Sequence, residues 1–202
     1  MNTSHGPTTT HRLTATITLI AALATGTGTA TSIATAQAPT VTIVGATAAE
    51  TELVAWALDL YTEAGLELPA VTIQFHEDFN GCRGYNGYYT RIGHTVDICN
   101  RGDLKVEARH TLVHELAHAW KFETLTAADT AAFTARRGLE AWDEGKAWWQ
   151  MGQEQAAEVI SWALIDGLDN HWVHLEGCED LAAEYTALTG LTPLNTASNS
   201  CK

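Results

Sequence analysis

The segment 111–120 constrains this chain more than any other, because it places two histidines four residues apart within an apolar run. Residues four apart lie on one face of an α-helix, one turn above the other. His114 and His118 can therefore present two imidazole nitrogens to one metal ion. Glu115 lies about 100° further around such a helix, where its carboxylate can reach a water molecule beside the ion without binding the ion itself.

The residues around this motif are uncharged, which favours a helix that is buried on several sides. Two histidines and a glutamate in such a helix are costly to desolvate unless they gain a partner, and a metal ion is such a partner. Two neutral nitrogen ligands, an open coordination position and a carboxylate base are what a metal-dependent hydrolase needs. The alternative is an ordinary helix whose polar face carries these residues by chance.

A third protein ligand must come from further along the chain. Segment 153–164 favours two candidates, because its apolar residues mark a buried helical face with Glu154 and Glu158 four apart on its edge. Two partly buried like charges at this spacing repel each other unless a cation lies near them. The alternative is an amphipathic helix with two solvated acids. The other candidate ligands are Glu140, Asp143, Glu144, His171 and His174. Three tryptophans between segments 111–120 and 153–164 either line the site or pack in the core: Trp142, Trp148 and Trp149.

The two segments together resemble the zincin metallopeptidases, and more narrowly the gluzincins of secreted bacterial type. Uncharged residues surround the two histidines as in the zincin signature. Segment 154–158 resembles the second gluzincin motif, a glutamate followed four residues later by an acid. The metzincin pattern is excluded, since Lys121 and Thr124 stand where that branch has glycine and histidine.

The resemblance implies a ligand set and a reaction. By this likeness His114, His118 and Glu154 bind Zn²⁺, Glu115 is the catalytic base, and Glu158 holds a ligand histidine by a hydrogen bond. The implied reaction is hydrolysis of a peptide bond in a peptide or protein substrate. Such enzymes use a Tyr or His donor to stabilise the oxyanion, and the sequence leaves five candidates open: Tyr88, His110, His171, His174 and Tyr185.

The expected fold is α+β and zincin-like, a single domain with a small, mainly antiparallel sheet packed on the metal-binding helix and a helical C-terminal half. Strand patterns cover residues 41–44, 71–75, 88–92 and 95–99, and a capping box at Thr47 and Glu50 begins a helix after the first of them. By the resemblance, residues 94–98 would be the sheet edge that pairs with an extended substrate. A plain edge strand is the alternative.

Residues 1–36 have the pattern of a secretory signal peptide, which leaves residues 37–202 as the zincin-like metallopeptidase domain. The segment contains no Asp or Glu, Arg12 precedes the apolar stretch 17–24, and small residues lead to Ala36. Cleavage after Ala38 and an uncleaved membrane tether are the alternatives. We therefore expect an extracellular monomer without stable membrane association after processing.

The cysteines and the net charge agree with this expectation. Four cysteines allow three pairings, and we predict Cys82 with Cys99 and Cys178 with Cys201, because each pair closes a short loop. A structural zinc held by cysteines is the alternative, although no Cys-x-x-Cys spacing supports it. The formal charge of −13 argues against a nucleic-acid partner, which would require a basic patch.

Two other functions compete with hydrolysis. The first is a secreted zinc-binding or partner-binding protein on a zincin scaffold without turnover, which would have no use for the carboxylate of Glu115. The second is a protein whose metal only stabilises the fold. A structural site would unfold the chain when the metal is chelated, whereas a catalytic site would lose activity and keep most of its secondary structure.

Overall fold

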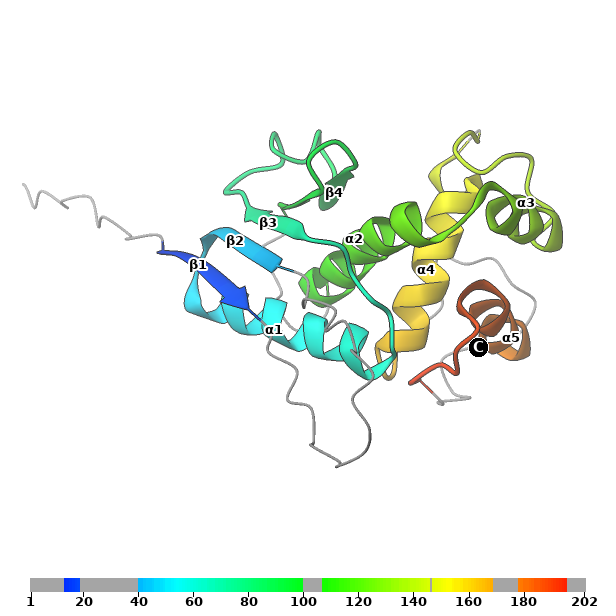
Figure 1. Cartoon of the computed structure of the whole chain (residues 1–202). Coiled ribbons are helices and arrows are strands. Elements are labelled where there is room, and N and C mark those ends of the chain that lie inside the picture. The colour runs from blue at the N-terminus through cyan, green and yellow to red at the C-terminus, as the bar shows by residue number, and fades with distance from the viewer. Residues whose placement is uncertain (1–12, 19–39, 100–106, 146, 169–177, 196–202) are drawn as a thin grey trace, which may run out of the picture.

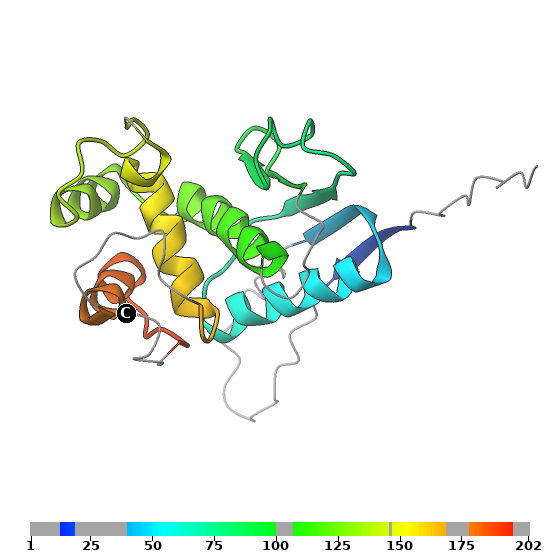
Figure 2. The same ribbon diagram turned by 180° about the vertical axis from the view of Figure 1, so that it is seen from behind.

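The computed structural model of the chain describes residues 13–18, 40–99, 107–145, 147–168 and 178–195. Within these ranges the chain is α+β, with one mixed five-stranded sheet and five α-helices. The sheet and helix α1 form one half of the molecule, and helices α3, α4 and α5 form the other (Figure 1). Helix α2 lies between the two halves, and the view from behind shows the same arrangement (Figure 2).

The sheet has the strand order β1-β2-β3-β5-β4. Its central pairs, β2 with β3 and β3 with β5, are parallel, whereas β1 and β4 pair antiparallel at the two ends. The prediction of a mainly antiparallel sheet is therefore wrong. The physical reason is that helix α1 crosses over between β2 and β3, and a helical crossover brings the two strands it joins into parallel alignment. The strand bounds are Leu13–Thr18, Thr40–Ala46, Val71–Phe75, Gly87–Thr90 and Thr95–Ile98 for β1 to β5.

Helix α1, Ala48–Glu63, begins with the predicted capping box. The Thr47 hydroxyl accepts the Glu50 backbone N–H, and the Glu50 carboxylate accepts the Thr47 backbone N–H at 2.7 Å. Near its other end the buried Tyr61 hydroxyl donates a hydrogen bond of 2.8 Å to the Val113 carbonyl oxygen. The crossover helix is thereby fixed to α2, one residue before the first histidine of the motif.

Strands β4 and β5 fall on the last two predicted strand patterns and form an antiparallel hairpin, but their places in the sheet differ from the expectation. Strand β5 lies between β3 and β4, so its main chain pairs on both sides, and β4 is the outermost strand. The prediction that residues 94–98 form the substrate-pairing edge is therefore wrong. The predicted Cys82–Cys99 disulfide is present and ties the loop before β4 to the end of β5. The predicted pairing of Cys178 with Cys201 lies outside the described residues.

The motif helix, α2, joins the sheet half to the helical half. Helix α2 is buried between the sheet and α4 because its apolar run faces both, and residues such as Leu112, Val113 and Leu116 have no exposed surface. Burial of each such side chain contributes about 1.5 to 3 kcal/mol. A capping box at Thr126 and Asp129 begins α3. The helix bounds are Glu107–Thr124 for α2, Ala127–Arg136 for α3, Gly152–Leu164 for α4 and Cys178–Thr189 for α5, with a 3-10 turn at Trp148–Gln150.

Strand β1 lies within the segment 1–36 that the sequence predicts to be a signal peptide, and it pairs antiparallel with β2. The signal peptide stays a prediction, and its removal would leave β2 as the outermost strand on this side of the sheet. Among the described residues, no helix combines the length and the apolar character needed to cross a membrane.

Candidate metal centre

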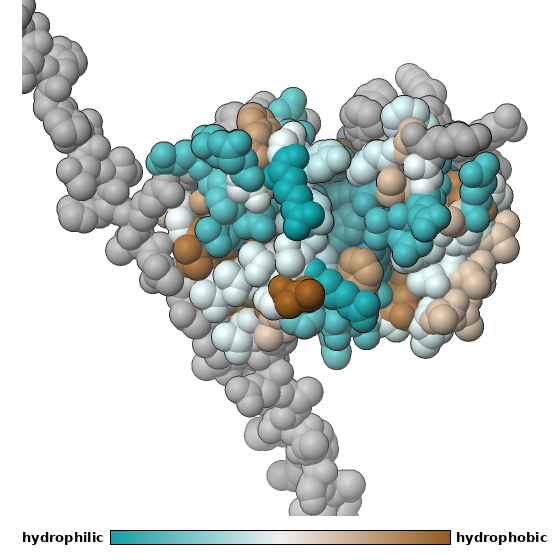
Figure 3. Space-filling view, turned by 90° about the horizontal axis from the view of Figure 1, so that it is seen from above, coloured by the Kyte–Doolittle hydropathy of each residue, from teal (hydrophilic) through white to brown (hydrophobic). Residues whose placement is uncertain are grey.

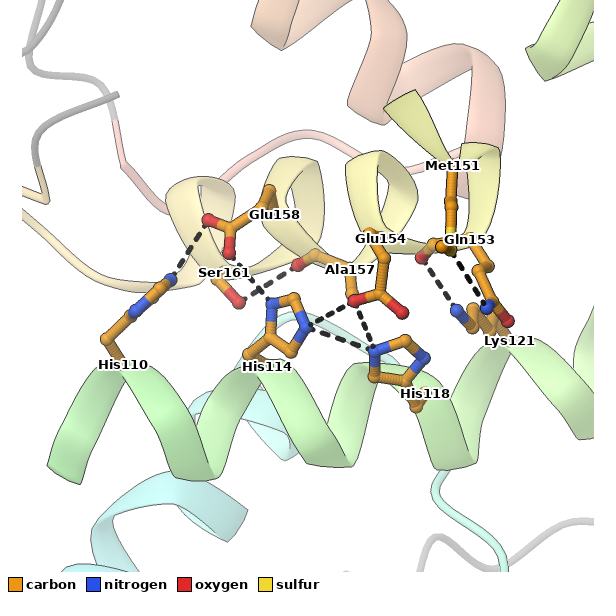
Figure 4. Close-up of polar contacts among 10 residues, drawn as sticks. All are labelled: His110, His114, His118, Lys121, Met151, Gln153, Glu154, Ala157, Glu158 and Ser161. Atoms are coloured by element: carbon orange, nitrogen blue, oxygen red, sulfur yellow. Dashed lines mark hydrogen bonds and ion pairs between the residues drawn. The ribbon is translucent and has the colours of Figure 1, made fainter. Parts of the chain in front are cut away.

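Five side chains from two helices meet where α2 crosses α4 (Figure 4). His110, His114 and His118 follow one another along α2 at intervals of four residues and face α4. Glu154 and Glu158 face them from successive turns of α4. The structure thus brings together His114, His118, Glu154 and Glu158, which the sequence had selected from two distant segments.

Three atoms of this cluster are spaced as the ligands of one small ion. The Nε2 atoms of His114 and His118 are 3.0 Å apart, and they lie 3.1 and 3.2 Å from Glu154 Oε2. With metal–ligand bonds of about 2.0 to 2.1 Å, a tetrahedral zinc site separates its ligand atoms by roughly 3.3 Å. All three side chains are buried, so bulk water does not screen the charge between them.

The contact with Glu158 bears on which ring nitrogen of His114 carries the hydrogen, and therefore on whether Nε2, which faces Glu154, has a lone pair. Its Oε1 lies 2.9 Å from His114 Nδ1. An ionised carboxylate only accepts hydrogen bonds, so its closeness favours the His114 tautomer with a hydrogen on Nδ1, although the pair lacks hydrogen-bond geometry. In a neutral His114 the Nε2 atom then has a lone pair, which points at the Glu154 oxygen. Two acceptors at 3.1 Å repel each other unless a cation lies between or beside them.

The pKa shifts in the cluster reflect the same demand for positive charge. Burial opposes protonation of His114, but hydrogen bonds with Glu154 and Glu158 outweigh it and raise the pKa of His114 to about 10. Burial, followed by the charge of Lys121, lowers the pKa of His118 to about 3. For Glu154, burial is outweighed by hydrogen bonds from both histidines, which hold the pKa of the carboxyl well below its usual range. These shifts favour one positive charge in the cluster, which a proton on His114 or a metal ion beside the same atoms would supply.

Glu115 lies beside this cluster, beneath strand β4. Its side chain is only 8% exposed, and its carboxylate accepts a hydrogen bond from the Tyr89 backbone N–H. Gly87 is so close that a Cβ there would stand 2.7 Å from Glu115 Cγ and 2.9 Å from Glu115 Oε1. Burial is the main cause that raises the pKa of Glu115 to about 7, with Glu154 adding to it and His114 opposing it. A carboxyl group that titrates near neutral pH can both take and return a proton.

Lys121 is a charged residue of the site that the sequence reasoning missed. It is 1% exposed, and its Nζ donates a hydrogen bond of 2.6 Å to the Gln153 carbonyl oxygen. This bond ties α2 to the first turn of α4, next to Glu154. Burial lowers the pKa of Lys121 to about 7. The available signal was its position three residues after His118, which places it near the same helical face.

One of the three tryptophans lies at the site. The Trp148 ring stacks on the His114 imidazole, with centroids 5.6 Å apart and ring planes at 28°. Trp142 instead packs edge-on against Phe133 with centroids 6.0 Å apart, and Trp149 is exposed. Seen from above, the surface is hollowed between the two halves of the molecule, and hydrophilic residues border the hollow (Figure 3).

The remaining sequence candidates lie elsewhere. In the described part of the chain, two groups of His and Glu side chains are spaced so that they could hold a metal ion. Three of the possible ligands are exposed and belong to neither group: Glu140, Asp143 and Glu144. His171 and His174 lie outside the described residues. Of the possible oxyanion donors, His110 contacts Glu158 through Nε2, Tyr185 is fully buried, and the Tyr88 ring lies 4.3 Å from the Arg83 guanidinium.

No protein-family model, curated protein or solved structure matches this chain. The function must therefore be inferred from the site itself. The structure defines an α+β protein in which two histidines and one glutamate from crossing helices are placed to hold a metal ion.

Proposed function

We propose that this protein is a secreted zinc-dependent metallopeptidase of the zincin type. In this proposal His114, His118 and Glu154 are the zinc ligands, and Glu115 is the general base. The observation that carries it is the contact of three buried atoms that can bind a metal, at 3.0 to 3.2 Å from one another, with the buried carboxylate of Glu115 beside them. The α+β fold, with the motif helix packed beneath the end of a small mixed sheet, is compatible with a zincin.

The donor set and its charge suit a divalent ion. Two imidazole nitrogens and one carboxylate oxygen are ligands that zinc accepts in catalytic sites. Three carboxylates are buried here beside one ammonium group, which leaves two negative charges when the histidines are neutral and Lys121 is protonated. The carboxylates are Glu115, Glu154 and Glu158. When bound, a zinc ion would polarise a substrate carbonyl group and lower the pKa of a water molecule.

Glu115 would move the proton. A water oxygen forms a bond to the peptide carbonyl carbon while Glu115 takes one hydrogen of that water. The C–N bond then breaks, and Glu115 passes the proton to the leaving nitrogen, so that a carboxylic acid and an amine are formed. The pKa of about 7 supports this role, because the group can hold the proton briefly at neutral pH and release it.

Strand β4 is the better candidate for substrate pairing than residues 94–98. It is the outermost strand at its end of the described sheet. The Tyr89 backbone N–H donates a hydrogen bond to the Glu115 carboxylate, and Gly87 packs closely against the Glu115 side chain. An extended peptide that adds to this edge by main-chain hydrogen bonds would pass beside the Glu115 carboxylate. The proposed substrate is therefore an extended segment of a peptide or protein.

The test compares the purified protein with Glu115→Gln and Glu123→Gln. Glu123 is a matched control, because it lies on the same helix but its side chain is 44% exposed. Bound zinc is quantified for each protein, and cleavage is assayed on an unfolded protein and on a mixed peptide library. We expect all three proteins to bind one zinc ion, and only Glu115→Gln to lose cleavage.

Other outcomes would change the conclusion. If all three proteins bind zinc and none cleaves, the protein is a zinc-binding or partner-binding protein without turnover. If Glu115→Gln cleaves as well as the wild type, Glu115 is not the base. If the wild type binds no metal, the metal centre itself is wrong.

A further inference from the structure

Glu158 is held at both of its oxygens by histidines of α2. Its Oε1 faces His114 Nδ1 and its Oε2 faces His110 Nε2, each at 2.9 Å. The His110 contact is a hydrogen bond, whereas the His114 contact is a close pairing of the two groups without hydrogen-bond geometry. His110 is partly exposed, with 22% of its side-chain surface accessible, whereas Glu158 and His114 are buried. The three residues therefore form a chain of contacts from the edge of the site to the proposed zinc ligand.

The second contact of Glu158 matters because its carboxylate is buried. A buried carboxylate oxygen without a donor loses its water and gains nothing in return, which destabilises that position of the carboxylate. A carboxylate held at one oxygen only can also rotate about its last bond. Rotation of Glu158 would loosen its contact with His114 Nδ1, and this contact sets the hydrogen position and ring orientation of His114.

We propose that His110 is a positioning residue of the metal centre, an inference that rests on the proposed zinc site. His110 donates its Nε2–H to Glu158 and thereby holds the carboxylate against His114 Nδ1. His114 is thus kept with a hydrogen on Nδ1 and with Nε2 oriented toward the metal position. Residues that hold metal ligands in this way change metal affinity without touching the ion.

The length of Glu158 fits this role. An aspartate at this position would be one methylene shorter. His110 and His114 lie one helical turn apart, with ring centroids at 5.9 Å. The longer glutamate side chain lies between the two rings and contacts both, so the added methylene is accommodated by the histidine that precedes the motif.

A rival role for His110 is that of a ligand to a second ion. Ligand atoms of His110, His114 and Glu158 all lie within 4.8 Å of one another. That role would require His114 to lose the hydrogen on Nδ1 and to bridge two ions. The hydrogen bond between His110 Nε2 and Glu158 Oε2, with the other carboxylate oxygen 2.9 Å from His114 Nδ1, favours the positioning role instead. The zinc content per chain separates the two roles.

The experiment measures zinc affinity by competition with a chromophoric chelator for the wild type, His110→Ala and His110→Gln. His76 provides a matched control, because its side chain is 21% exposed and its Nε2 lies 2.6 Å from Asp97 Oδ1, away from the metal centre. We expect His110→Ala to weaken zinc binding about 3- to 10-fold, less than the about 10- to 100-fold typical of a direct partner of a ligand. His110→Gln should stay within about twofold because its amide N–H can donate to Glu158. His76→Ala should have wild-type affinity.

A double-mutant cycle tests whether His110 acts through Glu158. In a Glu158→Gln background, His110→Ala should have no further effect on zinc affinity. A full additional loss in that background, or wild-type affinity of His110→Ala, would overturn the proposal. Melting of the zinc-free proteins is measured in parallel. A merely structural role would lower the melting temperature of zinc-free His110→Ala and leave its zinc affinity unchanged, and this result would also overturn the proposal.

The outcomes separate this inference from the proposed function. If the wild type binds no zinc, both fail. If the wild type binds zinc and His110→Ala is unaffected, only the role of His110 fails. If His110→Ala weakens zinc binding but the wild type cleaves no peptide, the role of His110 stands and the peptidase proposal fails. Two zinc ions per wild-type chain, with one lost in His110→Gln, would make His110 a ligand and overturn the positioning role.

Discussion

Replacing Gly87 with alanine should disturb the site at one defined point, where strand β4 lies against helix α2. A Cβ at this position would stand 2.6 Å from Thr111 Cγ2, 2.7 Å from Glu115 Cγ and 2.9 Å from Glu115 Oε1. Non-bonded carbon atoms prefer separations of about 3.5 to 4.0 Å. The strand and the helix must therefore move apart by roughly 1 Å, or the Glu115 side chain must turn away.

The size of the effect follows from this overlap. Adding a methyl group to a well-packed contact costs about 1 to 3 kcal/mol, which corresponds to a melting temperature lower by roughly 2 to 12 °C for a domain of this size. Misplacing a catalytic group by about 1 Å can lower the rate by roughly 100-fold. Zinc affinity should change little, because the proposed ligands lie where α2 faces α4.

The assay combines thermal melting, peptide cleavage and zinc affinity for Gly87→Ala, alone and together with Thr111→Ser. The serine removes the methyl group of the closest contact, so the double variant should recover part of the melting temperature. It should not recover cleavage, since both contacts with Glu115 remain. If Gly87→Ala melts and cleaves like the wild type, the close packing of β4 on Glu115 is wrong.

Three further predictions concern the ligands and the disulfide. Loss of a residue that only holds a ligand typically weakens zinc binding about 10- to 100-fold, and Glu154→Gln should weaken it by more than this. A near-wild-type affinity in chelator competition would remove Glu154 from the ligand set. Zinc affinity should rise about tenfold per pH unit between about pH 7.5 and 9, because binding displaces one proton from His114, whose pKa is about 10, and none from His118, whose pKa is about 3. A slope of zero or two protons would contradict this assignment. Replacing both Cys82 and Cys99 with serine opens a loop of sequence separation 17 and should cost about 3 kcal/mol, or roughly 6 to 12 °C in melting temperature; unchanged melting would contradict a stabilising cross-link.

The parts of the site that depend on helical spacing could be predicted from the sequence. His114 and His118 share a face because they are four residues apart, and Glu154 and Glu158 share one for the same reason. The structure places these two faces opposite each other. The disulfide was predictable because its cysteines are close in sequence and flank a hairpin. In each case a local rule was sufficient.

The strand order could not be obtained from local rules alone. The hairpin pattern shows that β4 and β5 pair, but not which of the two also pairs with β3, because that contact joins distant segments. The parallel pairing of β2 and β3, by contrast, could have been predicted from the sequence. A strand, a helix with a capping box and a second strand in succession favour a crossover and a parallel pair.

Two residues of the site were missed for different reasons. His110 precedes His114 by the same four residues that separate His114 from His118, so the helical rule applied to it as well. From the sequence alone it is one of five possible oxyanion donors. Lys121 is buried against the usual preference of lysine for the surface. Its burial depends on the approach of α4, which brings the Gln153 carbonyl oxygen within reach.

The position of the cluster between two helices has a consequence for the lifetime of the protein. His118 and Glu154 are 36 residues apart, and the whole of α3 lies between them. An ion bound to both residues would close the chain between them into a loop, as a removable cross-link does. The ion would thereby lower the conformational entropy that this stretch gains when it unfolds. When zinc is scarce, the stretch between the helices should open first and be exposed to cleavage by other proteases. The zinc supply around the protein would then set how long the molecule survives.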